Sequence, residues 1–360
     1  MDIVIFFGTL VVVVSTMLPV LRVRHWFVRG MDFPRLQIAY LAAALLVVQF
    51  FFLDLQSMLD RLLILVVSLC LLWQLWWILP YTFFWVKEVE TSRNYDFDRQ
   101  LSVITANVLQ TNRDSKTLIE LVQQYQPDIL VTLESDQWWE SRLDELAADM
   151  PHSVKCPLEN FYGMHVYSRL PFNEQEIVYL VEKNVPSIHV SVTLRTGDKV
   201  RMYFLHPAPP SPTENTESIE RDVELIAVAR SIAEIDQPVV ITGDLNDVAW
   251  SATTRQFRKI SGLLDPRVGR GMFNTFHVDY AFLRWPLDYL FHSSEFRLKT
   301  IRRLPSIGSD HFALYTVLSF EPAASAVQEG LAATNADHQD AKKTMEELPV
   351  SENDVPRLDT

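Results

Sequence analysis

The chain has 360 residues, of which 48% are hydrophobic, and a formal net charge of −13. This length accommodates one large domain with additional segments, and two cysteines, Cys70 and Cys156, are too few for a disulfide framework. Nine acidic and three basic residues lie between Glu321 and Thr360, so the rest of the chain carries −7. A net negative charge disfavours binding to duplex DNA, which normally requires a basic surface.

Three long apolar runs occupy the first 85 positions. They extend from Ile3 to Leu21, from Leu36 to Leu53 and from Leu62 to Trp85, and none contains a charged residue. Because about 20 apolar residues cross a bilayer, residues 1–86 are predicted to form a membrane region with three transmembrane helices. A buried helical core is the less favoured alternative. No basic residue precedes the first run, so it is interpreted as an anchor rather than a cleaved signal peptide.

The basic residues between the apolar runs predict the orientation. The first connection contains four arginines, namely Arg22, Arg24, Arg29 and Arg35, whereas the second contains only Arg61. The positive-inside rule therefore predicts that the N-terminus is outside. The first connection and everything after the third helix are predicted to lie in the cytoplasm. The reverse orientation, with the C-terminal region outside the membrane, is the alternative.

Three further segments follow the membrane region. Residues 87–99 are charged and polar and are predicted to be a linker. Residues 100–320 alternate apolar, strand-like runs with amphipathic helices, one of which Ser115 can cap. Residues 321–360 contain few large apolar side chains and are predicted to form a disordered acidic tail.

The most informative motif is Gly-Asp-Leu-Asn at positions 243–246, directly after the apolar run from Val239 to Thr242. In an extended chain, side chains two residues apart point to the same side. Asp244 and Asn246 are therefore expected to act together. A carboxylate in such a place can hold or deprotonate a water, and a carboxamide can bind an oxyanion. Ordinary turn residues are the alternative interpretation.

Chemically active side chains also flank the other apolar runs. They are Asn107, Glu134 and His206 at the ends of runs, Asp288 at the start of one, and Asp310 with His311 before another. Catalytic groups are commonly carried where strand ends converge at one edge of a sheet. These residues are therefore candidates for one site.

In this order the motifs resemble those of the endonuclease/exonuclease/phosphatase superfamily. The resemblance covers about residues 101–320. It rests on Asn107, Pro-Asp-Ile-Leu at 127–130 with Glu134, Tyr-Ser-Arg-Leu-Pro at 167–171, His206, Gly-Asp-Leu-Asn at 243–246, Leu-Asp-Tyr at 287–289 and Ser-Asp-His at 309–311. The chain is identified as a bacterial-type member with N-terminal transmembrane helices, in the inner or plasma membrane. The implied fold is α+β, a four-layer α/β/β/α sandwich of two packed sheets between outer helices, preceded by the three transmembrane helices.

The resemblance also implies hydrolysis of phosphate esters with a divalent metal, usually Mg2+, with Mn2+ as the alternative. Glu134 would be the main metal ligand, with Asn107 beside it. Asp310 would lie near the metal or the leaving group. These oxygen-bearing side chains suit magnesium, which keeps several waters in its shell.

The remaining roles follow from the same resemblance. Asp244 would deprotonate the attacking water, and Asn246 would hold a phosphate oxygen. His311 would contact the phosphate and be oriented by Asp288, while His206 would protonate the leaving oxygen. Arg169 in the Tyr-Ser-Arg-Leu-Pro motif is left open between substrate binding and support of the fold.

Three functions are compatible with the sequence. A membrane-anchored phosphodiesterase or phosphatase acting on lipid-linked or small phosphate esters is favoured by the predicted bilayer tether and the acidic charge. A membrane-tethered endonuclease or exonuclease acting on DNA is the first alternative, which the acidic charge disfavours. A catalytically silent binding scaffold is the second, which the presence of every acid–base residue disfavours.

Overall fold

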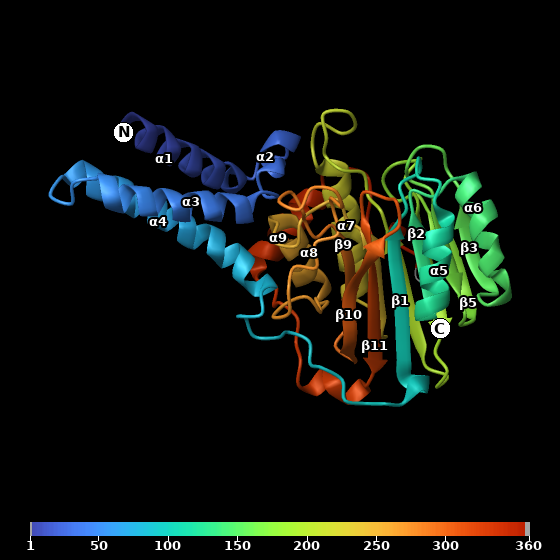
Figure 1. Ribbon diagram of the computed structural model, residues 1–360. Coiled ribbons are helices and arrows are strands. Elements are labelled where there is room, and N and C mark those ends of the chain that lie inside the picture. The colour runs from blue at the N-terminus through green and yellow to red at the C-terminus, as the bar shows by residue number, and fades with distance from the viewer. Residues whose placement is uncertain (1, 357–360) are drawn as a thin grey trace.

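The computed structural model describes residues 2–356, which form a helical bundle attached to an α+β body (Figure 1). The bundle contains α1 (Asp2–Met17) with the 3-10 turn η1 (Leu18–Leu21), α3 (Arg35–Phe52), and α4 (Met58–Ile78) with η2 (Leu79–Tyr81). The short helix α2 (Trp26–Gly30) lies in the connection between α1 and α3. The N-terminus and the turn between α3 and α4 lie at the end of the bundle away from the body.

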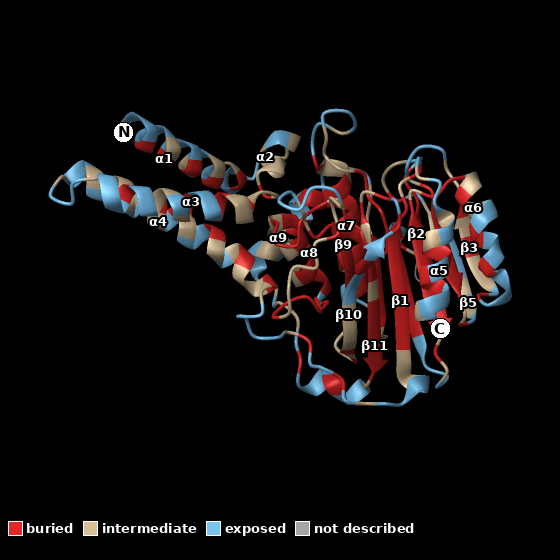
Figure 2. Cartoon of the chain, in the orientation of Figure 1, coloured by how far each residue is buried: buried red, intermediate tan, exposed pale blue. Residues whose placement is uncertain are grey.

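Among the described residues, three helices are long and apolar enough to cross a membrane, as the sequence predicted. Only 22–28% of the residues in these spans are buried, so most of the apolar surface of the bundle is exposed (Figure 2). The third span differs from the predicted run to Trp85, because α4 ends at Ile78. Pro80 cannot donate a backbone hydrogen bond and restricts the residue before it, so the α-helix stops there.

The body contains two β-sheets. The first is six-stranded, and its order is β10 (Phe296–Ser306), β11 (Phe312–Phe320), β1 (Gln100–Asn107), β2 (Ile129–Leu133), β4 (Met164–Ser168) and β3 (His152–Cys156). The second is five-stranded, and its order is β5 (Phe172–Val178), β6 (Ser187–Thr193), β7 (Lys199–Leu205), β8 (Val239–Asp244) and β9 (Asp288–His292). The pairs β1–β2 and β7–β8 are parallel, and the other pairs are antiparallel.

The sheets pack face to face between helices, which confirms the predicted four-layer sandwich. Val103 of β1 and Met202 of β7 share the apolar core between the sheets. Ile104, one position further along β1, points to the opposite face and packs under α5 (Ser115–Tyr125) and α6 (Gln137–Leu143). The outer face of the second sheet is covered by α7 (Ile219–Ala233) and α8 (Ala252–Ser261). The N-cap of α5 is Asp114 rather than the expected Ser115, since its carboxylate accepts from Thr117 N at 3.2 Å.

The segment predicted as a linker, residues 87–99, is ordered along the edge of the first sheet. Ser92 N donates to Leu298 O at 2.8 Å, and Leu298 N donates to Glu90 O at 3.0 Å, so the segment extends the sheet beside β10. Val89 is completely buried. The segment ends in the short turn η3 (Phe97–Arg99) before β1.

The tail predicted to be disordered is instead folded over residues 321–356, and its last four residues lie outside the described part of the chain. It contains η5 (Pro322–Ala326), α9 (Asn335–Met345) and η6 (Glu352–Asp354). Met345 is 7% exposed and joins the apolar cluster of α7 and α8. Lys259 of α8 also donates to both oxygens of Asp337 at 2.8 Å. A few apolar residues suffice because the helix needs to cover only a surface that is already apolar.

The folded tail leads to a stability prediction. We expect Met345→Ala to lower the free energy of unfolding by about 2 kcal/mol, because it empties a buried site, and to lower the Tm by about 5 °C. Lys342→Ala is the matched control, since Lys342 lies on the same helix with its side chain 74% exposed. Thermal unfolding of the full chain in detergent measures both. A disordered tail would leave the two variants with the same Tm as the parent chain.

Candidate active site

The strand order places the candidate residues at one edge of the sandwich. Asn107 ends β1 and pairs with Leu133 of the parallel strand β2, so Glu134, the next residue, lies beside it. In the second sheet, β8 ends at Asp244. Asp288 begins the antiparallel strand β9 and is directly paired with Asp244. The ends of both sheets therefore contribute carboxylates to the same place.

Both candidate histidines lie at this edge as well. His206 follows β7, which is parallel to β8. His311 immediately precedes β11, which runs antiparallel to β1 and thus begins where β1 ends. The hydroxyl groups of Thr105 in β1 and Thr242 in β8 are in hydrogen-bond contact across the two sheets. This contact keeps the two sheet edges close enough for their side chains to form one site.

Asn107 joins the two carboxylates from opposite sheets. Its Nδ2 donates to Glu134 Oε1 at 2.7 Å and to Asp244 Oδ2 at 3.3 Å. Its Oδ1 accepts from Leu109 N at 3.1 Å, which fixes the orientation of the amide. Burial raises the pKa of Glu134, although the hydrogen bond from Asn107 opposes the shift. Glu134 has a φ of 58°, a left-handed conformation that is unfavourable for a residue other than glycine and that accumulates at functional sites.

His311 lies between two buried carboxylates. Its Nδ1 is 2.8 Å from Asp288 Oδ2, and its Nε2 is 3.5 Å from Asp244 Oδ2. Burial alone would lower the pKa of His311, but the charges of Asp288 and Asp244 outweigh it and raise the pKa to about 10. Burial raises the pKa of Asp244 to about 7, and the His311 charge opposes this shift. The imidazole is therefore a fixed cation at neutral pH, suited to an anionic substrate.

Asn246 is held by its backbone as well as by its side chain. Asn246 N donates to Asp244 Oδ1 at 2.8 Å, and its Nδ2 donates to Pro207 O at 3.0 Å. Its φ is 51°, a second left-handed residue at the site. Arg221, which sequence analysis missed, donates to Asn246 O at 2.8 Å and pairs with Asp247 at 3.3 Å. Arg221 lies within α7 with no motif around it, so no sequence signal distinguishes it from a surface arginine.

His206 is at the edge but is fully enclosed. Only 3% of the residue is exposed, and its ring centroid is 5.3 Å from that of Tyr162. Burial, assisted by the charge of His311, lowers the pKa of His206 to about 4. Its Nδ1 has no hydrogen-bond partner within residues 2–356. His206 is consequently neutral at pH 7 and a weak candidate for donating a proton.

Arg169 does not lie with the other candidates. Its Nε donates to Pro127 O at 3.0 Å, and its Nη1 donates to Asp149 O at 3.2 Å. Pro127 precedes β2, whereas Glu134 follows it, so Arg169 is at the opposite edge of the sheet. Of the two roles left open by the sequence, these contacts fit support of the fold.

Five of the candidate residues line a cavity of about 580 Å³. Its polar side is formed by Glu134, Asp244, Asn246, Asp310 and His311. The facing side is mainly apolar and is formed by Trp26, Phe33, Pro34, Pro209, Pro210, Phe276, Leu283, Trp285 and Leu287, with Arg29 and Gly30 among them. Trp26 to Pro34 belong to the connection between the first two apolar helices, so the helical bundle closes one wall of the cavity. Sequence analysis did not predict this wall, since more than 70 residues separate Pro34 from Asn107, the first candidate site residue.

The donors at this edge fit a hard divalent cation. Glu134 and Asp310 supply carboxylate oxygens, the ligands that Mg2+ prefers. Asn107 now turns Nδ2 toward Glu134 and Oδ1 toward Leu109 N, so it would have to rotate its amide to bind the ion through oxygen. Asp244, Asp288 and His311 also bring ligand atoms within 4.8 Å of one another. We favour the Glu134 side, because His311 Nδ1 and Asp288 Oδ2 already bind each other at 2.8 Å. A cation beside Glu134 would also supply the positive charge that this half-buried carboxylate lacks.

Comparison with known proteins agrees with this geometry. Residues 104–311 match the sequence profile of the Endonuclease/Exonuclease/phosphatase family, and the match spans more than half of the chain. The chain belongs to this family, whose members are phosphoester hydrolases and nucleases. No curated protein matches the chain in sequence.

Solved structures share the fold of the body. The TDP2 of D. rerio, humanized by 14 mutations, is 20% identical with a TM-score of 0.53, over 61% of this chain and 99% of that one. The family member from Beutenbergia cavernae is 19% identical with a TM-score of 0.51, over 62% and 72%. The catalytic domain of human nocturnin is 17% identical with a TM-score of 0.51, over 62% and 96%. At such low identity these likenesses establish the fold alone.

The position of Arg169 gives a test of the site's extent. We expect Arg169→Gln to lower the free energy of unfolding by about 1 kcal/mol, because it removes hydrogen bonds to two backbone carbonyl groups. The KM and kcat for a phosphate ester should stay unchanged, since the side chain is at the far edge of the sheet. Steady-state kinetics and thermal unfolding of the same preparation distinguish the two effects. A large rise in KM at an unchanged Tm would instead indicate that Arg169 binds the substrate.

Proposed function

We propose that the protein is a membrane-anchored, divalent-metal-dependent phosphoesterase whose substrate is an amphipathic phosphate ester, such as a lipid-linked phosphate. The observation that carries the proposal is the composition of the cavity. Carboxylates, an amide and an imidazolium face an apolar wall that comes from the segment between two membrane-spanning helices. A substrate with an anionic group and an apolar part matches both sides of this cavity.

Several contacts support a fixed position of the connection between α1 and α3, which we call the membrane connection, on the α+β body. Trp250 Nε1 donates to Asp32 O at 2.8 Å, and Trp26 N donates to Thr216 O at 2.9 Å. The rings of Phe33 and Trp285 pack edge to face with centroids 5.5 Å apart. These contacts support the inclusion of the apolar wall in the proposed site. A lipid leaving the bilayer along the bundle would meet it first.

The proposed anchoring and orientation rest on the three spans. Their exposed apolar surface needs a lipid environment, since a large apolar patch is rare on a soluble protein. The ends of α1 and α4 and the start of α3 lie next to the body (Figure 1), so the four arginines of the first connection are on its side. The positive-inside rule then favours a cytoplasmic catalytic domain.

In the proposed mechanism, Glu134 and Asn107 would hold the metal ion, with Asp310 nearby. When bound, the ion would neutralise phosphate charge and polarise the reacting oxygen. Asp244 accepts the proton of the attacking water, and its pKa near neutrality suits a general base. The base is placed by Asn107, which donates to it at 3.3 Å.

Phosphate binding is assigned to Asn246 and His311, both of which line the cavity. Asp288 keeps His311 protonated through Nδ1 and aims Nε2 toward Asp244. His206 stays a candidate for protonating the leaving oxygen, but its pKa is lowered and it does not line the cavity, whereas Asp310 does. Arg29 is the only arginine or lysine among the described lining residues, so the cavity lacks the basic surface that a nucleic-acid substrate requires.

Activity should require both the base and the metal. We expect Asp244→Asn to reduce kcat by about 100-fold or more, because an amide cannot accept the proton, and EDTA to abolish turnover until Mg2+ or Mn2+ is restored. The assay uses the full chain in detergent with a phospholipid, a polyprenyl diphosphate, a soluble diester and plasmid DNA. Preferential cleavage of DNA would favour the nuclease alternative. A fully active Asp244→Asn protein would contradict the assigned base, and an inactive parent chain that still binds these esters would favour the scaffold.

The apolar wall should matter only for lipid substrates. We expect Trp26→Ala to raise the KM for a long-chain phosphate ester by about tenfold, the scale of losing one large buried apolar contact. The kcat for a short soluble ester should stay close to that of the parent. Phe84→Ala is the matched control, because Phe84 is 78% exposed near the end of α4 but does not line the cavity. Equal effects of both variants would mean that the aromatic rings act only through general contact with the membrane.

A further inference from the structure

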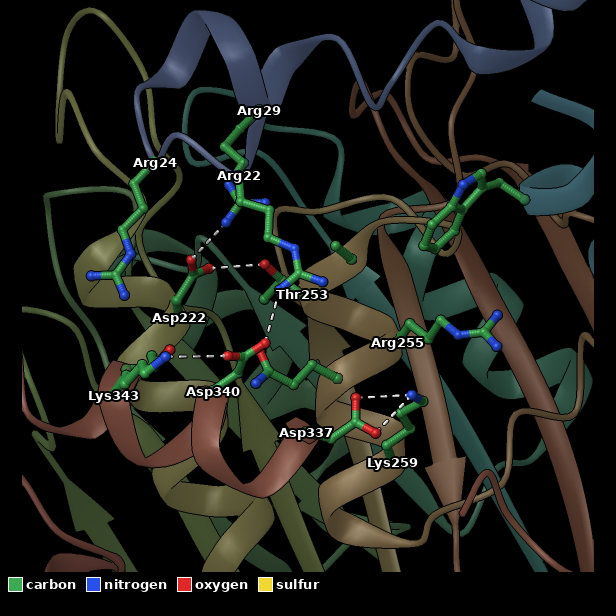
Figure 3. Close-up of a pocket in the computed structure, with 14 residues that line it drawn as sticks. Arg22, Arg24, Arg29, Asp222, Thr253, Arg255, Lys259, Asp337, Asp340 and Lys343 are labelled. Atoms are coloured by element: carbon green, nitrogen blue, oxygen red, sulfur yellow. Dashed lines mark hydrogen bonds and ion pairs between the residues drawn. The ribbon is translucent and has the colours of Figure 1, made fainter. Parts of the chain in front are cut away.

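A second cavity, of about 310 Å³, lies between the first membrane connection and helices α8 and α9 (Figure 3). Its lining is dominated by charged side chains. The basic ones are Arg22, Arg24, Arg29, Arg255, Lys259 and Lys343, and the acidic ones are Asp222, Asp337 and Asp340. We call these nine residues the basic pocket. None of the carboxylates or histidines of the candidate active site lines it, and Arg29 is the one residue shared with that cavity.

The carboxylates of the basic pocket are already paired. Arg22 contacts Asp340 at 2.8 Å, and Lys259 contacts Asp337 at 2.8 Å. Asp222 is 3.6 Å from Arg29 and also pairs with Arg221, which lies outside the pocket. Arg24 pairs with Glu347 outside the pocket at 3.0 Å, and Lys343 is 4.0 Å from Asp340, which Arg22 already contacts. Among the described residues of the pocket, Arg255 is therefore the cation left without a carboxylate.

Two arginines that line this cavity lack a partner for their charge or for a hydrogen-bond donor among the described residues. Arg255 has an unpaired charge, and Arg29 has an unused hydrogen-bond donor. Arg255 forms no ion pair with any residue that the structure describes, and its guanidinium lies 5.7 Å from the ring centroid of Trp77. Arg29 has only 13% of its side chain exposed, and its buried Nε has no hydrogen-bond partner within residues 2–356. A buried donor without a partner is costly. An ion-pair network that served only to join two parts of the protein would not need this excess of positive charge.

The basic pocket is at the level where lipid headgroups would lie. Arg22 directly follows the first span, Ile3–Leu21, and Trp77 is near the end of the third span, Met58–Tyr81. Tryptophan is typical of the membrane–water interface. Clustered basic side chains there are attracted to anionic lipids. Arginine is also the preferred partner of phosphate, because its guanidinium can form two parallel hydrogen bonds.

We propose that the basic pocket binds the phosphate headgroup of an anionic phospholipid from the surrounding bilayer. The cavity volume suits a headgroup and is too small for acyl chains, which would stay along the bundle. The bound phosphate accepts hydrogen bonds from Arg255 and Arg29 and offsets the surplus charge. Because the pocket combines the first connection, α8 and α9, the lipid would fasten the folded tail and the catalytic body to the membrane region. This site is separate from catalysis.

The test measures lipid binding to the full chain in nonionic detergent, with EDTA present so that hydrolysis cannot consume the probe. Dioctanoyl phosphatidylglycerol is titrated against dioctanoyl phosphatidylcholine and inorganic phosphate, and bound lipid is counted by native mass spectrometry. We expect phosphatidylglycerol to bind more tightly than the other two probes. Arg255→Gln and Lys343→Gln should each weaken its binding by about fivefold, the effect of one basic residue near an anionic membrane.

Lys342→Gln is the matched control. It removes the same charge from the same helix as Lys343→Gln, and its side chain is as exposed as that of Lys343 (74% against 73%), but Lys342 does not line the pocket. Arg255→Gln breaks no ion pair within the described residues, so the variant should fold. Unchanged phosphatidylglycerol binding in Arg255→Gln and Lys343→Gln would overturn the proposal, and so would inorganic phosphate competing as well as the lipid. Turnover of a soluble ester by these variants should match the parent, so failure of this site and failure of the catalytic proposal remain distinguishable.

Discussion

The burial of negative charge at one edge of the sandwich is the constraint on which the rest of the site depends. Glu134, Asp244 and Asp288 lie close together in a region of low dielectric, where each unpaired carboxylate would cost several kcal/mol. His311 supplies one compensating charge, and the raised pKa values of Glu134 and Asp244 indicate that more is needed. The same shortage of positive charge makes the edge suitable for a divalent cation. It also explains why Asn107 is oriented to donate to Glu134 beside one sheet and to Asp244 of the other.

The membrane connection is the second element that defines the molecule. Asp32 is buried and paired with Arg35 at the start of α3, while its carbonyl accepts from Trp250 of the body. Direct contacts of this short segment therefore link α3 of the helical bundle to the α+β body. One side of the connection forms the apolar wall of the candidate active site, and the other forms part of the basic pocket. Arg29 lies between the two.

Much of the site was predictable because its residues lie at strand ends, where the chain direction fixes the position of each side chain. Asn107, Glu134 and Asp244 needed only the order of apolar runs and the family resemblance. The position of Arg169 was not predictable from strand ends alone. Arg169 follows β4, which is antiparallel to β2, so it lies at the edge of the sheet opposite to Glu134. The tail was misjudged for a different reason. Composition measures the average apolar content, whereas α9 depends on a few residues such as Met345 meeting an apolar surface of α7 and α8.

The sequence by itself determined the local features: three apolar spans, the alternation of strands and helices, and the candidates for the acid–base residues. These depend on neighbouring residues and on hydrophobic periodicity, which one chain displays directly. The tertiary structure alone decided what faces those residues. The apolar wall from Trp26 to Pro34, the support of Asn246 by Arg221, and the basic pocket all join segments far apart in the chain. No local pattern specifies such contacts, because they arise only when the packing of two sheets and a helical bundle brings the segments together.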